Sequence, residues 1–188
     1  MNLFEGYFRV NYLDIEISVD TLRHMDTPDV IDRVVAAWKL ARPDLDPSPL
    51  ELVGRVIVLA QHLERSVELA LDRHHLTLGQ FDILATLRRH GPKGGLTPSQ
   101  LLESVMLSSG GMTARLDSLT DAGLIYRKTD PKDRRKVVVA LTAKGRRVID
   151  AATATRFTEA TESMPPLGPA ERATLEQLLR RWLAQVAG

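Results

Sequence analysis

The sequence contains no cysteine, which excludes disulfide bonds, thiolate metal sites and thiol redox switches. Aromatic residues are scarce, at 5% of 188 residues, and no apolar run approaches the ~20 residues that cross a bilayer. The chain does not start with a basic segment followed by an apolar core, so no secretion signal is predicted. We therefore expect a cytoplasmic protein without a membrane partner.

Neither sign of charge is in excess, because the formal net charge is only +1. The length predicts one domain, or one domain with an appendage, and leaves room for a substantial core. Any argument for nucleic-acid binding must therefore come from the distribution of charge along the chain.

Signatures of common enzymes are also missing. The sequence has no phosphate-binding glycine loop, no serine nucleophile elbow and no HExxH motif. The neighbouring carboxylates Asp44 and Asp46 lie in a proline-rich linker. The protein is therefore predicted not to be an enzyme, and no cofactor is expected.

Helical patterns dominate from residue 27 onward. Thr27 and Pro28 predict the start of a first helix, and an apolar stripe predicts a long second helix around 53–71. Capping boxes that begin at Thr77 and Thr97 predict the starts of two more helices. The fold class is therefore mainly α, with a small β component.

The β component follows a helix-turn-helix pattern. A short helix, the turn "LSSGG" and the helix "MTARLDSLTDA" precede two alternating strands, "LIYRKT" and "KVVVALT". This order predicts a winged helix-turn-helix, in which the strands form a hairpin. We expect the second strand to bury Val137, Val139 and Leu141 against the helices.

The tip of this hairpin concentrates positive charge. Residues 127–136 include six basic and two acidic side chains, a local excess of +4 in a chain of net +1. Such a tip would bind DNA phosphates in a salt-dependent way, and an arginine on it can enter the minor groove. Lys132, Arg134 and Arg135 are the predicted DNA contacts. By itself, the hairpin could also be a solvated turn.

The second helix of the pair is the predicted reading helix. Ser108 and Ser109 offer hydroxyl groups at its start, and Gly111 lets the backbone approach a duplex closely. Thr113 and Arg115 follow along the helix. These five residues complete the predicted DNA-binding set.

The stretch from "LTPSQLLESVMLSSGGMTARLDSL" through "GLIYRKTDPKDRRKVVVALTAKG" resembles the DNA-binding lobe of the MarR family. The resemblance implies a homodimer that binds a pseudo-palindromic operator, with Arg135 in the minor groove and Arg134 on the DNA backbone. Repression is the family default. Apolar stripes on the long helix and on "LEQLLRRWLAQV" independently favour a dimer. The implied domains are a 1–26 extension (an arm or a non-native start), 27–75 dimerisation and ligand-pocket helices, a 76–142 winged helix-turn-helix lobe, and 143–188 C-terminal dimerisation helices.

Four further residues resemble the urate-responsive branch of that family. They are Trp38 in an extra first helix, Asp82 before the helix-turn-helix, Arg115 in the reading helix and Arg127 after "GLI". Two arginines and an indole can hold a flat anionic heterocycle by charge, fork geometry and stacking. The resemblance therefore implies a urate-like ligand. Taken singly, Trp38 could belong to the core, Asp82 could form a structural pair, Arg115 could contact DNA and Arg127 could be a surface residue.

Two other functions remain open from the sequence. One is a zinc-responsive regulator, and the other is a helical protein-interaction module without DNA binding. The candidate zinc ligands are His62, His74, His75, His90, Glu64 and Asp72. Adjacent His74 and His75 would point in different directions on a helix, which argues against a single centre that uses both.

Overall fold

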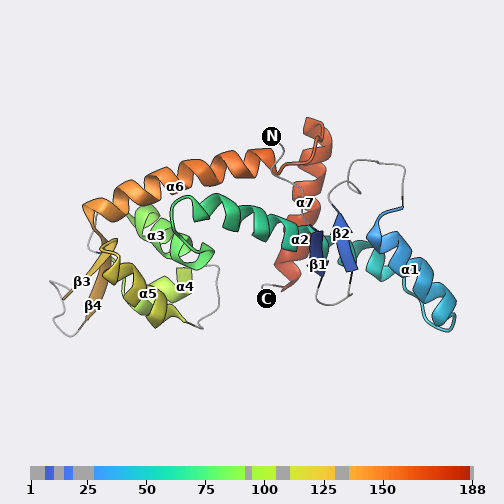
Figure 1. Cartoon of the computed structure of the whole chain (residues 1–188), viewed down its shortest axis with the longest axis horizontal. Coiled ribbons are helices and arrows are strands. Elements are labelled where there is room, and N and C mark those ends of the chain that lie inside the picture. The colour runs from blue at the N-terminus through green and yellow to red at the C-terminus, as the bar shows by residue number, and fades with distance from the viewer. Residues whose placement is uncertain are drawn as a thin grey trace. The chain divides into compact units, whose positions relative to one another are not determined.

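The structure is a computed structural model of the chain (Figure 1). It describes residues 7–10, 15–18, 28–91, 95–104, 111–129 and 136–186. The chain divides into two compact units, Met1–Leu69 and Ala70–Gly188. No helix in these described ranges is long and apolar enough to cross a membrane.

The first unit begins with a small hairpin. Strands β1, Tyr7–Val10, and β2, Ile15–Ser18, pair antiparallel. Helix α1 then spans Val30–Ala41, and the long helix α2 spans Pro49–Asp72, so that α2 continues into the second unit.

Helix α1 starts two residues later than the sequence predicted. Its N-cap is Asp29 rather than Thr27, because the Asp29 carboxylate accepts hydrogen bonds from the backbone N–H groups of Ile31 and Asp32, at 2.8 and 2.9 Å. The Asp32 carboxylate accepts from the Asp29 N–H in return, at 2.8 Å. This reciprocal capping box satisfies the first amides of the helix better than a lone threonine cap.

Arg55 of α2 ties the start of α1 to α2. Its Nε donates to Asp29 at 2.7 Å, and an Nη donates to Asp32 at 2.6 Å. The hydrogen bond from Arg55 holds the pKa of Asp32 below its ordinary value, and the two carboxylates raise the pKa of Arg55. Beside it, Gly54 allows close packing, since a Cβ there would lie 2.9 Å from Ile31 Cδ1.

The second unit carries the predicted helix-turn-helix and hairpin (Figure 1). Its elements are α3 (Leu78–His90), α4 (Pro98–Ser104), α5 (Met112–Asp121), β3 (Ile125–Thr129), β4 (Val137–Leu141), α6 (Ala143–Glu162) and α7 (Pro169–Val186). Both predicted capping boxes are confirmed: the Thr77 hydroxyl accepts from Gln80 N–H, and the Thr97 hydroxyl accepts from Gln100 N–H, each at 3.2 Å.

Strands β3 and β4 pair antiparallel, with Arg127 opposite Val139. On its other edge, Val139 exchanges two backbone hydrogen bonds with Leu96, at 2.8 and 3.0 Å. The expected burial of Val137 is wrong: Val137 is 48% exposed, whereas Val138 and Val139 are both buried. The centre of β4 lies against α3, α4 and α6, so successive side chains are covered there, while Val137 lies toward the tip.

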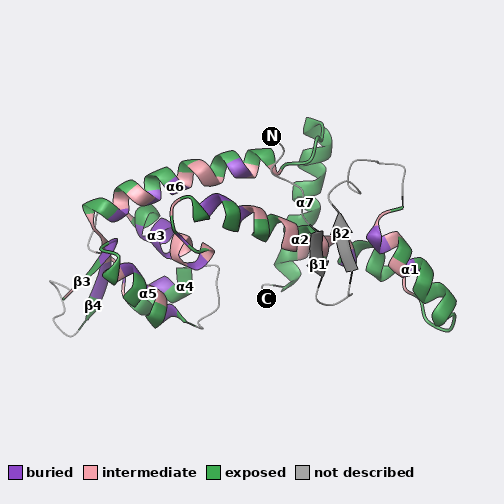
Figure 2. Cartoon of the chain, in the orientation of Figure 1, coloured by how far each residue is buried: buried purple, intermediate pink, exposed green. Residues whose placement is uncertain are grey.

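The core of the second unit joins α3, α4, α5, the hairpin and α6. Its largest fully buried side chains include Ile83, Leu84, Leu101, Leu119, Ile125, Val139 and Ile149. Helix α7 differs sharply, because none of its described residues is buried (Figure 2). Its exposed apolar side chains are Leu175, Leu178, Leu179, Leu183 and Val186.

Candidate functional site

The reading helix α5 starts with an unusual cap. Its N-cap is Gly111, which adopts a left-handed conformation at φ +82° and offers no side-chain hydrogen bond. Thr113 is exposed on the first turn. The other predicted DNA contacts, Ser108, Ser109, Lys132, Arg134 and Arg135, lie outside the described residues.

One face of α5 packs into the unit through buried Met112, Leu116 and Leu119. A side-chain bond adds to this packing, because Gln80 Nε2 of α3 donates to the Ser118 hydroxyl of α5 at 3.1 Å. Gln80 is also the last residue of the α3 capping box. The residue that caps α3 therefore also holds the reading helix.

Arg115 lies against the first turn of α3. A Cβ added to Gly79 would meet Arg115 Nε at 2.6 Å, so the absence of a side chain at Gly79 makes room for the arginine. Asp82 follows Gly79 by three residues on α3 and is half-buried. At this spacing both residues lie on one face of the helix. Asp82 therefore lies on the face of α3 that carries Gly79, the residue against which Arg115 lies.

Arg127 lies on a different side of α5. Its Nη2 forms an ion pair with Asp117 Oδ1 of α5 at 2.5 Å, and the two side chains are 40% and 53% exposed. Asp117 follows Arg115 by two residues, which is a rotation of about 200° around an α-helix. Arg115 and the partner of Arg127 therefore lie on nearly opposite sides of the reading helix.

Trp38, the fourth predicted ligand residue, belongs to the first unit. It lies near the end of α1 and is 48% exposed. It is therefore not a core residue of the single chain. The neighbouring Leu40 and Leu45 are exposed as well.

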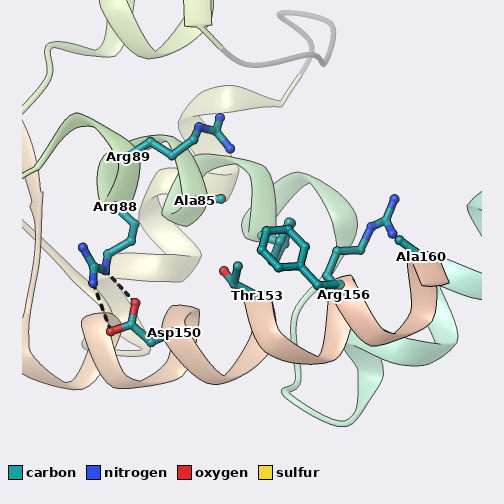
Figure 3. Close-up of a pocket in the computed structure, with 9 residues that line it drawn as sticks. Ala85, Arg88, Arg89, Asp150, Thr153, Arg156 and Ala160 are labelled. Atoms are coloured by element: carbon teal, nitrogen blue, oxygen red, sulfur yellow. Dashed lines mark hydrogen bonds and ion pairs between the residues drawn. The ribbon is translucent and has the colours of Figure 1, made fainter. Parts of the chain in front are cut away.

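A cavity of about 520 Å³ lies between α3 and α6 (Figure 3). Its lining residues are Phe81, Ala85, Arg88, Arg89, Asp150, Thr153, Arg156, Phe157 and Ala160.

Ion pairs hold two of the three arginines in this cavity. Arg88 Nε donates to Asp150 at 2.6 Å, which raises the pKa of Arg88, and Arg156 pairs with buried Glu159 at 2.6 Å. Arg89 donates to the Thr86 hydroxyl at 2.9 Å. Two phenylalanines beside three guanidinium groups suit an aromatic anion.

The histidines proposed as zinc ligands do not gather in the part of the chain that is described. Among those residues, no group of three or more His, Cys, Asp or Glu side chains could hold a metal ion. His74 Nε2 is instead hydrogen-bonded to Thr155 at 2.8 Å.

Sequence reasoning missed three residues whose contacts position α5. Gly79 carries no recognisable motif, and Gln80 was identified only as part of a cap. Asp117 is an ordinary exposed helix residue whose ion pair joins a helix to a strand ten residues later. Helical periodicity predicts contacts within a helix, so it gives no signal for this pair.

Comparison with known proteins places this geometry among transcriptional regulators. Residues 76–137 of the chain match the MarR family. The chain is 30% identical over 159 residues to the HTH-type transcriptional regulator PecS of Dickeya dadantii. The matched segment covers 85% of this chain and 93% of PecS.

Two solved structures share the fold. A mutant MarR from E. coli complexed with operator DNA superposes with a TM-score of 0.61 at 26% identity, covering 83% of this chain and 99% of that one. Bordetella bronchiseptica BpsR also gives a TM-score of 0.61, at 25% identity, over 71% of this chain and 94% of that one. The BpsR structure concerns regulation of its DNA binding by 6-hydroxynicotinic acid.

Proposed function

Because the chain belongs to the MarR family of DNA-binding transcriptional regulators, we propose that it acts as a homodimer on a pseudo-palindromic operator and that a small anionic ligand releases it. The proposed ligand is urate or a similar planar acid, and the proposed mode is repression. Residues 27–75 and 143–188 would supply the dimer and the ligand pocket, and residues 76–142 would bind DNA.

The observation that carries this proposal is the position of α5. Arg115 is part of this helix and lies on Gly79 of α3, whereas Arg127 of β3 is paired with Asp117 of the same helix. An anion that captures either guanidinium therefore acts directly on the element that would read DNA.

Other features support the remaining parts of the proposal. The exposed apolar face of α7 suits a second copy of the chain. Two-fold symmetry would place two reading helices about one DNA turn apart. The +4 excess between residues 127 and 136 suits the DNA backbone.

Release needs only a modest coupling free energy. A coupling of about 1–3 kcal/mol between ligand and DNA lowers operator affinity by roughly 5- to 150-fold. A ligand that draws Arg115 away from Gly79 would remove one contact that fixes α5 on α3.

The position of Arg115 can be changed without unfolding the protein. In Gly79→Ala, the added Cβ would lie 2.6 Å from Arg115 Nε, so the flexible guanidinium must move. Alanine favours the helix by up to about 1 kcal/mol, so we expect thermal stability to change little. Operator affinity in an anisotropy titration should fall by about 5-fold, equivalent to ~1 kcal/mol. Wild-type affinity in this variant would mean that the placement of Arg115 does not matter for DNA.

The ligand itself is tested by adding urate to the DNA complex. We expect urate to release operator DNA from the wild-type protein, and Trp38→Phe and Arg127→Ala to weaken this release by at least about 5-fold, within the usual range of coupling. Trp182→Phe and Lys128→Ala are matched controls, since they alter the second tryptophan and the next cation of β3.

Equal release of DNA by urate in all four variants would show that Trp38 and Arg127 are not part of the ligand site. The cavity between α3 and α6 offers the other location, because Phe81 and Phe157 could enclose a ring beside Arg89. Loss of release in Phe157→Ala, with release retained in Arg127→Ala, would assign the ligand to that cavity.

A further inference from the structure

The ion pair between Arg127 and Asp117 joins the reading helix to the hairpin sheet. Arg127 lies on β3, opposite Val139 of β4, and Val139 is hydrogen-bonded on its other edge to Leu96. The backbone under Arg127 is therefore held by a paired sheet. Asp117 belongs to α5, so the pair connects the sheet side of the wing to the helix.

Two polar side-chain contacts thus restrain α5, one from α3 and one from β3. Gln80 of α3 donates to Ser118, and Arg127 of β3 donates to Asp117. The apolar residues Leu116 and Leu119 are buried between these contacts. Loss of one polar contact would leave the apolar face of α5 buried, with the other polar contact as the remaining side-chain restraint.

The solvent exposure of Arg127 and Asp117 determines how readily the ion pair between them breaks. Arg127 is 40% exposed and Asp117 is 53% exposed, so water and dissolved anions reach both groups. Ion pairs this exposed are weak and exchange easily. An anion with two acceptor atoms can match the guanidinium fork better than the single contact seen with Asp117.

We propose that Asp117 is a positioning residue that competes with the ligand for Arg127, and that its displacement is the step by which the ligand loosens the reading helix. The inference rests on the proposed function, because it requires a ligand anion at Arg127. The ligand class it implies is an oxyanion or a planar anionic heterocycle that presents two adjacent acceptors.

Asp117→Asn tests the competition directly. Asparagine keeps the size and one acceptor oxygen of aspartate but removes the charge, so Arg127 is no longer held by an ion pair. We expect the DNA-free variant to bind urate about 3- to 10-fold more tightly in calorimetry, because the internal competitor is weakened. Without urate, its operator affinity should already approach that of the urate-saturated wild-type protein, and added urate should change it by less than about 3-fold.

Asp121→Asn is the matched control. It removes the same charge from the same helix, one turn further on, where Asp121 is exposed. We expect this control to keep wild-type urate binding and a full urate response. Asp117→Glu should restore the response, because glutamate retains the carboxylate. Thermal unfolding of all three variants should match wild type within a few degrees, since the altered positions are exposed.

The outcomes separate this inference from the proposed function. A wild-type protein that responds to urate, together with an Asp117→Asn variant that behaves like Asp121→Asn, overturns the role of Asp117 alone. A wild-type protein that neither binds urate nor releases DNA overturns the proposed ligand. Tighter urate binding and reduced release in Asp117→Asn, with rescue by Asp117→Glu, supports both.

Discussion

The double substitution Arg134→Ala/Arg135→Ala is expected to reduce operator affinity by about 100-fold or more, because each specific arginine contact contributes roughly 1–3 kcal/mol. These residues supply two of the six cations between 127 and 136. Fewer phosphate contacts also release fewer counterions. The slope of log affinity against log salt should therefore become shallower by about 2 to 4, depending on whether one or both protomers contribute.

The matched control removes two cations elsewhere. Arg33 of α1 and Arg65 of α2 are exposed in the first unit, and Arg33→Gln/Arg65→Gln changes the net charge by the same amount. Anisotropy titrations at several salt concentrations compare the two double variants. If both lose the same affinity and slope, only total charge matters, and the wing has no specific role in DNA binding.

Leu179→Glu/Leu183→Glu is expected to abolish the proposed dimer. Both leucines lie on the exposed apolar face of α7, and Leu183 is 67% exposed in the single chain. A carboxylate at the centre of an apolar interface is costly to bury, so the variant should sediment as a monomer. Operator affinity should fall by about 100-fold or more, because a monomer loses the gain from binding two half-sites at once.

The opposite face of α7 provides the control. Gln177→Glu/Ala184→Glu adds the same two charges about half a helical turn away from the leucines. We expect this protein to remain dimeric and to bind its operator normally. A monomeric wild-type protein in sedimentation would contradict the dimer, and dimers in both variants would exclude the leucine face as the interface.

Local patterns in the sequence predicted most of the helices correctly, because their signals lie within a few residues. The capping boxes at Thr77 and Thr97 both form as expected. The hairpin was also predicted, since alternating strands flank a charged tip. The N-cap of α1 was misplaced because Asp29 and Asp32 form a reciprocal capping box beyond Thr27 and Pro28. Arg55, 26 residues from Asp29, adds a hydrogen bond to that cap, which no local pattern reports.

Burial within β4 and the contacts around α5 could not be predicted in the same way. Alternation assigns one face of a strand to the core, but the centre of β4 is covered by helices that are distant in sequence. Arg115 and Arg127 were expected to meet the same ligand. Their partners, Gly79 and Asp117, depend on how α5 packs between α3 and β3. Whether a ligand draws the two arginines together stays a prediction.

The binding of Arg55 to the cap residues of α1 has a consequence for the segment that carries Trp38. A helix of 12 residues is barely stable by itself in water, and here one guanidinium binds both acidic residues of its cap. The helix therefore gains part of its stability from α2, through this guanidinium and through the packing of Ile31 against Gly54. A change at this one arginine would therefore weaken the helix that carries the indole of Trp38 without altering any residue of the DNA-reading unit.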